Sequence, residues 1–295
     1  METRDLSFVH KPVSKVFLEE VVTPENIEKY KLSDDQVEFY RDYGYVADVK
    51  ILSDNQCDIL CEELEDISHP EYHKKDLWYE FHSNESTDPD TVLLHALGAW
   101  RMTHGFHDIL WHPAFLVPAS QLLGGSVRFW HDQLFSKPKK HGGVVAWHQD
   151  YSFWTRSKPM CHLTCWIGLD DVSTENGCLH YIPASHEWPL LPKTNLAGNM
   201  TAIQEVLSER QKEQFNPVPI EMKRGHATFH HPLLVHGSYE NKSDRPRRAT
   251  VINSALDGFY SDTDEPLLEG VPVIPPGRKI GGQFFPLLFD EEALH

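Results

Sequence analysis

The stretch Val144-Val145-Ala146-Trp147-His148-Gln149-Asp150-Tyr151 is the part of the chain around which the remainder can be organised. In this stretch an apolar run is followed by a histidine and an aspartate two residues apart. In an extended strand alternate side chains share a face, so we expect His148 and Asp150 to point the same way, with Gln149 turned aside. An imidazole and a carboxylate on one face are two ligands of the two-histidine, one-carboxylate triad that binds non-haem Fe(II). The stretch therefore predicts a metal-binding strand that needs a second histidine from elsewhere.

Composition excludes several kinds of partner. The 295 residues are 40% hydrophobic, which is enough for a sizeable core, and carry a formal net charge of −17. Nucleic acids and anionic membranes attract Lys and Arg, so this charge argues against both as the main partner, and solubility is its simplest explanation. We see no signal peptide, no apolar run long enough to span a bilayer and no peroxisomal signal at residues 293–295, so we expect a cytoplasmic protein. The sequence indicates no oligomeric state.

The five cysteines do not form a recognisable metal site. Cys57 and Cys61 lie one helical turn apart, and Cys161 and Cys165 share one strand face. Their number is odd, and the paired Cys-x-x-Cys spacing of structural zinc sites is missing. We expect all five, with Cys178, to be reduced thiols that pack in the interior.

The first third of the chain reads as helical. An N-cap serine at 33 and a glycine stop at 44 predict a helix, residues 45–51 a strand, and residues 53–68 a second helix. Residues 69–90, whose histidines at 69, 73 and 82 we expect to be solvated, read as a loop near the mouth of a site. Residues 91–123 read as mostly helical, interrupted at Gly105 and His112-Pro113. Residues 1–32 form an arm with a strand over 15–22.

From residue 126 the pattern becomes β. Strands are predicted over 127–135, 144–151, 161–170, 178–182, 225–230 and 247–253. Residues 189–216 form an insertion with a helix over 201–214, and residues 265–289 are a tail dense in Pro and Gly that we expect to lack regular structure. These elements predict one α+β domain over residues 33–295, with a double-sheet, jelly-roll core braced by N-terminal helices.

A second histidine and an arginine complete the arrangement. His236 follows Asp150 by 86 residues, and Arg247 follows His236 after a polar loop. We expect the two residues on neighbouring antiparallel strands, both pointing inward. A guanidinium there could form a bidentate pair with a carboxylate of 2-oxoglutarate whose keto acid end chelates the metal.

The sequence resembles the phytanoyl-CoA dioxygenase family of Fe(II)- and 2-oxoglutarate-dependent oxygenases, which have a double-stranded β-helix core. The resemblance covers about residues 33–253. The matching segments are Asp132-Gln133-Leu134-Phe135-Ser136-Lys137-Pro138, Trp147-His148-Gln149-Asp150, Trp166, Glu175-Asn176-Gly177-Cys178-Leu179, Ile182-Pro183-Ala184-Ser185-His186, Leu234-Val235-His236-Gly237-Ser238, Asn241, Ser243-Asp244-Arg245 and Arg247.

The resemblance implies a role for individual residues. It implies His148, Asp150 and His236 as iron ligands and Arg247 as the salt-bridge partner of 2-oxoglutarate. Gln133 and Trp166 fall where family members contact this co-substrate. Asp150 stands where related halogenases have a small residue, so hydroxylation with O2, yielding succinate and CO2, is favoured over halogenation.

Several residues allow more than one interpretation. His230 and His231 lie near His236, but they lack the spacing to the arginine. We expect hydrogen-bonded structural roles for His180 and His186, and solvent contact or ion pairing for Arg245 and Arg248. Trp147, Tyr151 and Trp154 are candidates for substrate contact, although about half of the aromatic residues near the ligands, Phe153 included, belong in the core on burial statistics alone.

Substrate identity is left open by the sequence. We expect a small or medium organic molecule held between residues 69–90, residues 151–158 and the tail. A basic rim for a CoA thioester could come from Lys137, Lys139, Lys140, Arg156 and Lys158, although such loops are usually just solvated. Two rival classes are a catalytically silent 2-oxoglutarate or metal-binding sensor and a zinc hydrolase with the same ligands. Arg247 argues against the hydrolase, which has no need of it.

Overall fold

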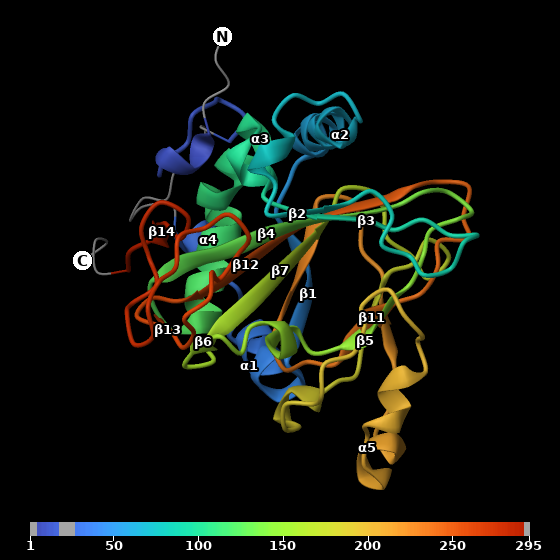
Figure 1. The fold of residues 1–295 in the computed structure, drawn as a ribbon. Helices are drawn as coiled ribbons and strands as arrows, with labels where there is room; N and C mark the ends of the chain where they lie inside the picture. Colours follow the sequence, from blue (N-terminus) through green and yellow to red (C-terminus); the bar gives the residue numbers. More distant parts are fainter. Residues whose placement is uncertain (1–4, 18–26, 292–295) are drawn as a thin grey trace.

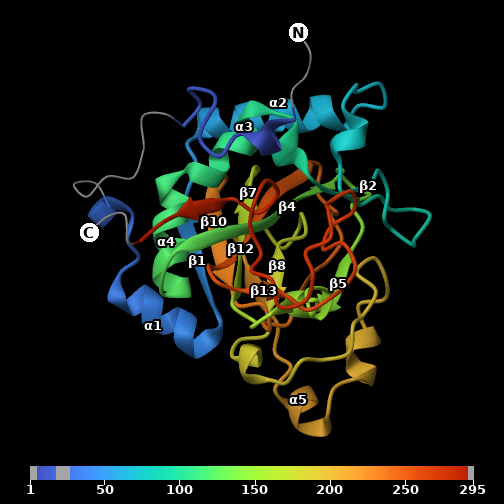
Figure 2. The ribbon, with the colours of Figure 1, turned by 60° about the vertical axis from the view of Figure 1, so that its left-hand side comes forward.

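Two antiparallel β-sheets face each other, and helices cover the outer face of the larger one (Figures 1 and 2). The computed structural model describes residues 5–17 and 27–291. The larger sheet has the order β1-β10-β7-β12-β4-β3-β2, with β14 also paired to β4, and the smaller has the order β5-β11-β8-β9. The arrangement is a jelly roll. Within the described part of the chain, no helix is both long and apolar enough to cross a membrane.

The strands of the larger sheet are β1 (Tyr45–Lys50), β2 (Glu80–His82), β3 (Leu94–Leu97), β4 (Val127–Lys137), β7 (His162–Gly168), β10 (His226–His230), β12 (Arg247–Leu256) and β14 (Leu287–Phe289). Those of the smaller sheet are β5 (Val145–His148), β8 (Leu179–Tyr181), β9 (Val218–Ile220) and β11 (His236–Ser238). A separate pair joins β6 (Ser157–Lys158) to β13 (Tyr260–Ser261).

The α-helices are α1 (Asp34–Tyr43), α2 (Asp54–Ser68), α3 (His104–Asp108), α4 (Pro113–Leu123) and α5 (Glu209–Glu213). The short 3-10 helices are η1 (Leu6–Phe8), η2 (Ile27–Tyr30), η3 (Lys75–Leu77), η4 (Ala99–Arg101), η5 (Ile109–Trp111), η6 (Asp150–Phe153), η7 (Ser185–Glu187) and η8 (Ala202–Glu205).

The first two α-helices begin and end where their capping residues predict. Ser33 and Ser53 each form a capping box, in which the serine hydroxyl accepts from the backbone three residues on and a glutamine side chain reaches back. Gly44 ends α1 with φ of 81°. A Cβ at Gly44 would come within 2.6 Å of Nδ1 of His186, so both the conformation and the space require glycine.

Alternation along the strands of the larger sheet divides the core into two layers. On β7, Leu163, Cys165 and Ile167 pack against the helices, whereas Trp166 belongs to the cluster between the sheets. Strand β12 does the same, with Ile252 in the outer layer and Val251 in the inner one. The inward-facing positions of these strands are therefore the ones available to build a site.

Several local predictions are wrong. Residues 94–97, expected to be helical, form strand β3, because pairing with β4 outweighs the helical preference of Leu and Ala. Residues 80–82, expected in a loop, form strand β2 by pairing with β3. The expected helix over 201–214 is two short helices, because Ser208 forms a capping box that starts α5 afresh. The tail contains β14, paired to β4. The predicted strand over 15–22 lies largely outside the described residues, and residues 15–17 are bends.

His236 and Arg247 do not lie on neighbouring strands. Strand β11, which begins at His236, pairs with β5 and β8 in the smaller sheet. Strand β12, which begins at Arg247, pairs with β4 and β7 in the larger sheet. The chain crosses from one sheet to the other between the two residues, so they reach the interior from opposite walls.

Candidate active site

Three side chains that could hold a metal ion meet between the two sheets. The ligand atoms of His148, Asp150 and His236 all lie within 4.8 Å of one another. Oδ1 of Asp150 lies 3.3 Å from Nε2 of His148 and 3.5 Å from Nε2 of His236. Two imidazoles and one carboxylate form the donor set that suits non-haem Fe(II) and leaves positions open for other ligands. The residues present therefore fit an iron ion.

The backbone places these three side chains. His148 and His236 are directly opposite each other in the β5–β11 register. Strand β5 ends at His148, and Asp150 begins the 3-10 helix η6, so the predicted single strand over 144–151 is shorter than expected. Gln149 remains extended, with φ of −114° and ψ of 130°, which keeps His148 and Asp150 on the same side.

Each histidine is held by the backbone carbonyl two residues before it. Nδ1 of His148 lies 2.8 Å from the carbonyl of Ala146, and Nδ1 of His236 lies 2.9 Å from that of Leu234. A carbonyl only accepts, so both Nδ1 atoms carry hydrogen and both Nε2 atoms present a lone pair. Burial, followed by the charge of His148, lowers the pKa of His236 well below its usual value, which favours the neutral, metal-binding form.

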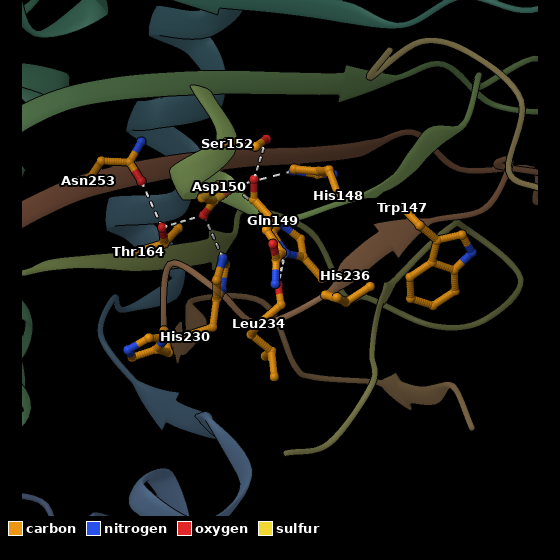
Figure 3. Close-up of polar contacts among 12 residues, drawn as sticks. Trp147, His148, Gln149, Asp150, Ser152, Thr164, His230, Leu234, His236 and Asn253 are labelled. Carbon is orange, nitrogen blue, oxygen red and sulfur yellow. Dashed lines mark hydrogen bonds and ion pairs between the residues drawn. The ribbon is translucent and has the colours of Figure 1, made fainter. Parts of the chain in front are cut away.

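The second oxygen of Asp150 is occupied by the protein (Figure 3). Oδ2 lies 2.6 Å from Oγ of Thr164 and 3.0 Å from Nε2 of His230. Burial alone would raise the pKa of Asp150, but the charge of His236 and the hydrogen bonds of His148 and His230 hold it well below the usual range. Asp150 is therefore an ionised carboxylate with Oδ1 turned toward the two histidines.

Sequence reasoning missed this supporting layer. Nδ1 of His230 lies 2.8 Å from the hydroxyl of Tyr181, and Oγ of Thr164 lies 2.9 Å from Oδ1 of Asn253. The alternation of side chains along β7 and β10 could have indicated these residues. A polar residue at an inward position of an otherwise apolar strand needs a hydrogen-bond partner in the interior. His230 is not one of the three clustered ligands, and its Nε2 contacts the carboxylate of Asp150 instead.

An inner cavity extends from the triad to Arg247. Arg247 is 1% exposed, and its Nε and Nη1 atoms have no hydrogen-bond partner among the residues that the structure describes. It stands over the ring of Trp166, 5.4 Å from the centroid, and Gln133 lines the same cavity. Burial lowers the pKa of Arg247 to about 10, so the side chain remains charged near neutral pH. An unpaired buried cation fits the carboxylate of a 2-oxo acid.

The structure corrects the prediction for Lys137. It is fully buried at the end of β4 rather than solvated in a hairpin loop. Its Nζ lies 2.6 Å from Oγ of Ser238 and 2.5 Å from the carbonyl of Tyr239. Burial, and next the charge of Arg247, lower the pKa of Lys137 well below 10.5. Lys137 therefore supports the strand that carries His236 and cannot belong to an exposed basic rim.

An outer cavity shares a boundary with the inner one. Gln133, Phe135, His148 and Asp150 line both. The three segments expected to hold a substrate all contribute to the outer wall, through Glu80, through Phe153, Trp154 and Arg156, and through Leu267 and Leu268 of the tail. Arg156 secures the tail by donating to the carbonyls of Pro266 and Leu267 at 2.8 and 3.1 Å.

Of the three aromatic candidates for substrate contact, the structure places only Trp154 on the cavity wall. Trp147 points away from Asp150 in Figure 3 and packs against Phe215, with ring centroids 5.0 Å apart. Tyr151 is buried, and its hydroxyl donates to the carbonyl of Ser157 at 2.8 Å.

The remaining histidines, arginines and cysteines agree with their structural interpretations. His180 and His186 hydrogen-bond backbone carbonyls, Arg245 is exposed, and Arg248 pairs with Asp170 at 2.8 Å. The histidines at 69, 73 and 82 are exposed. All five cysteines are free, and four of them are buried.

Comparison with known proteins points to one family. The sequence profile of the phytanoyl-CoA dioxygenase family matches residues 40–249. The chain is 27% identical to L-proline trans-4-hydroxylase of Streptomyces griseoviridis over 216 residues, which are 63% of this chain and 81% of that protein. It is 28% identical to peroxisomal phytanoyl-CoA dioxygenase of Bos taurus over 149 residues, 48% of this chain. The match spans only 44% of the bovine protein.

Solved structures share the fold. The carbocyclase SnoK from nogalamycin biosynthesis superposes with a TM-score of 0.70 at 24% identity, covering 91% of this chain and 99% of SnoK. The hydroxyectoine-bound EctD from S. alaskensis gives 0.65 at 19% identity, covering 96% of this chain and 93% of EctD. Fold and site together define a non-haem, Fe(II)- and 2-oxoglutarate-dependent oxygenase that uses O2. The chain belongs to the phytanoyl-CoA dioxygenase family.

Proposed function

We propose that this enzyme hydroxylates a small or medium organic molecule while 2-oxoglutarate is converted to succinate and CO2. His148, Asp150 and His236 are the proposed iron ligands, Arg247 anchors the distal carboxylate of 2-oxoglutarate, and Gln133 and Trp166 contact the same molecule. The observation that carries the proposal is the pair of cavities that share His148 and Asp150, with the unpartnered Arg247 lining only the inner one.

The chain's own residues position the co-substrate and the metal ligands and keep solvent away from the reaction. Arg247 fixes one end of the co-substrate, and the indole of Trp166, which lines the same cavity, packs beneath the guanidinium. Asp150 offers Oδ1 alone, because Thr164 and His230 occupy Oδ2. Iron bound with 2-oxoglutarate supplies the oxidising chemistry that activates O2 toward a C–H bond. The outer cavity holds that bond beside the metal and keeps reactive species away from solvent.

The presence of Asp150 favours hydroxylation over halogenation, because the carboxylate fills the position that a halide would require. Charge on the surface argues against a CoA thioester. Lys137 is buried, Lys140 pairs with Asp244 at 3.1 Å, and Lys158 pairs with Asp262. Three of the five residues of the expected basic rim are therefore already buried or ion-paired, which weakens the case for binding the phosphates of CoA.

Co-substrate binding tests the proposal directly. Anaerobic addition of Fe(II) and 2-oxoglutarate to the full-length protein should produce the weak visible charge-transfer band of a metal-chelated keto acid. Addition of Zn(II) in place of Fe(II) is the control and should give no band. Absence of the band with Fe(II) would exclude the proposed site. Release of succinate that is stimulated by an organic compound then separates an enzyme from a silent sensor.

A further inference from the structure

A row of polar side chains crosses the larger sheet beside the proposed iron ligands. The row consists of residues that lie opposite one another on four neighbouring strands, namely His131 on β4, Asn253 on β12, Thr164 on β7 and His230 on β10. All four are buried, at 1% to 2% exposed. Asp150 meets the row only at Thr164 and His230, through Oδ2. Within the described part of the chain, Asn253 and His131 form no hydrogen bond with a proposed metal ligand, so their place in the row needs another explanation.

The hydroxyl of Thr164 joins Asn253 to Asp150. Its Oγ lies 2.6 Å from Oδ2 of Asp150 and 2.9 Å from Oδ1 of Asn253. A hydroxyl has one hydrogen, so Thr164 can donate to only one of these oxygens at a time. Hydrogen bonds in such a chain polarise one another when they are buried. The position of the Asn253 amide therefore affects the hydrogen bond that Asp150 receives.

Asn253 continues the row to His131. Nδ2 of Asn253 lies 3.3 Å from Nδ1 of His131. Burial lowers the pKa of His131 to about 4, so the ring is neutral near pH 7 and has one N–H and one lone pair. An amide group can donate at one end and accept at the other. The contact is therefore compatible with either tautomer of the ring.

The far edge of the His131 ring belongs to the outer cavity. His131 lines this cavity, and its ring meets that of Trp154, another wall residue, edge to face with centroids 5.6 Å apart. Among the residues that the structure describes, Nε2 of His131 has no hydrogen-bond partner, and it is not completely enclosed by the protein. The row thus extends from Asp150 to the space proposed for the substrate.

We propose that Asn253 and His131 are positioning residues that act on Asp150 through Thr164, so that contacts made in the outer cavity are transmitted to the iron ligand. The inference rests on the proposed function, because it takes Asp150 as an iron ligand. Adjacency alone does not establish coupling, which requires that a change at one end of the row alters the other. Two measurements examine this in opposite directions.

A double-mutant cycle on metal affinity tests action toward Asp150. The affinity of the metal-free, full-length protein for Co(II) is measured by equilibrium dialysis. We expect Thr164→Val to lower this affinity about 10- to 100-fold and Asn253→Leu to lower it about tenfold, because each loosens the support of Oδ2. Since Asn253 acts through Thr164, the double variant should bind Co(II) no more weakly than Thr164→Val alone. Losses that multiply, or an unchanged affinity in Asn253→Leu, would overturn the inference.

The second measurement tests action toward His131. Coupling is reciprocal, so filling the metal site should be felt at the far end of the row. Zn(II) is diamagnetic, and nitrogen NMR of histidine-labelled protein should show that it shifts the ring resonances of His131, which are assigned by their loss in His131→Phe. The shift should disappear in Asn253→Leu. A shift that persisted there would arise from the charge of the metal through space and would count against the row.

Conservative and neighbouring variants serve as controls. Thr164→Ser keeps the hydroxyl and should retain both the wild-type affinity and the effect of Asn253→Leu. Ser254→Ala is the matched control on β12, because the hydroxyl of Ser254 bonds the carbonyl of Leu163 at 3.4 Å, outside the row, and Co(II) affinity should not change. If thermal melts show that Asn253→Leu does not fold, Asn253→Ser replaces it with the same expected results. If the charge-transfer band forms and the cycle is additive, the inference fails while the proposed function stands.

Discussion

Nε2 of His230 lies 3.0 Å from Oδ2 of Asp150, and this contact leaves Oδ1 as the carboxylate oxygen facing His148 and His236. His230 is in turn held by the hydroxyl of Tyr181, which lies 2.8 Å from Nδ1. The carboxylate is thus oriented before any metal arrives. Such orientation lowers the conformational cost of binding, because the ligand atoms are already directed at one point.

Replacement of His230 should therefore weaken metal binding. We expect His230→Phe to reduce the affinity of the protein for Co(II) by about 10- to 100-fold, because Asp150 loses one of its two supports. Equilibrium dialysis of the metal-free protein measures this without turnover. His226→Asn, on the same strand but paired with Asp48, is the matched control. Equal affinities for the wild type and His230→Phe would rule out the positioning role.

Arg247→Met should lower the affinity for 2-oxoglutarate and raise the stability of the protein without it. Loss of one partner of a buried charge pair costs about 2–5 kcal/mol, so co-substrate affinity should fall roughly 30- to 5000-fold. Without 2-oxoglutarate the variant should melt at a higher temperature than the wild type, because an unpaired buried cation is removed. Isothermal titration and thermal melts with and without 2-oxoglutarate measure the two effects.

Arg248→Met is the matched control for that experiment. Arg248 is adjacent in sequence but pairs with Asp170 and Glu65 away from the cavity. It should lower the melting temperature and leave co-substrate affinity unchanged. If both variants lost affinity equally, Arg247 would not be the anchor.

Asp108 should make folding stability depend on pH. It accepts from the backbone of Val13 and Ser14 at 2.8 and 2.7 Å and pairs with His107 at 2.8 Å, so it fastens the N-terminal segment to α3. Burial would raise the pKa of Asp108, but the hydrogen bonds of His107, Ser14 and Val13 lower it below 3.8. The stabilisation is therefore complete above the unfolded pKa and is lost as the pH falls through the folded pKa.

Asp108→Asn should accordingly lower the free energy of unfolding at pH 7 by about 3 kcal/mol. The difference from the wild type should shrink as the pH falls below 3.8. Urea unfolding across this range measures it. Asp42→Asn, at an exposed site on α1, should show no such difference. A difference that stayed constant down to about pH 3 would contradict the assignment.

The tail should prove structural. Phe285 is 1% exposed in the core between the helices and the larger sheet, and β14 pairs with β4. We expect Phe285→Ala to cost about 3–5 kcal/mol of unfolding free energy in denaturant unfolding. Val273→Ala, at an exposed tail position, should cost little. Removal of residues 265–295 should then yield no folded protein, and a soluble, cooperatively melting truncated chain would refute this.

Much of the fold and most of the proposed site could be predicted from local patterns. The capping serines and Gly44 placed α1 and α2, because caps depend on neighbouring residues alone. The period-two pattern placed most of the interior strands. His148, Asp150, His236 and Arg247 were identified by resemblance and spacing, and the structure brings all four to connected cavities.

Features that depend on distant partners could not be read in the same way. Residues 94–97 favour a helix locally and become β3 only because β4 offers a pairing edge. Lys137 appeared solvated beside Lys139 and Lys140, yet its three acceptors come from residues 238 and 239. Whether an aromatic side chain beside the ligands faces substrate or core also depends on packing, and Trp147 packs against the insertion.

Residues 144–151 show both what the sequence determines by itself and what only the tertiary structure decides. Its sequence alone fixed which two side chains share a side, because backbone alternation is a local property. Sequence could not reveal that His236 and Arg247 approach from opposite sheets, or that His230 and Thr164 hold Oδ2 of Asp150. Those relationships arise only when β5, β7, β10, β11 and β12 are packed into one barrel, since contacts across two sheets leave no periodic trace in the chain.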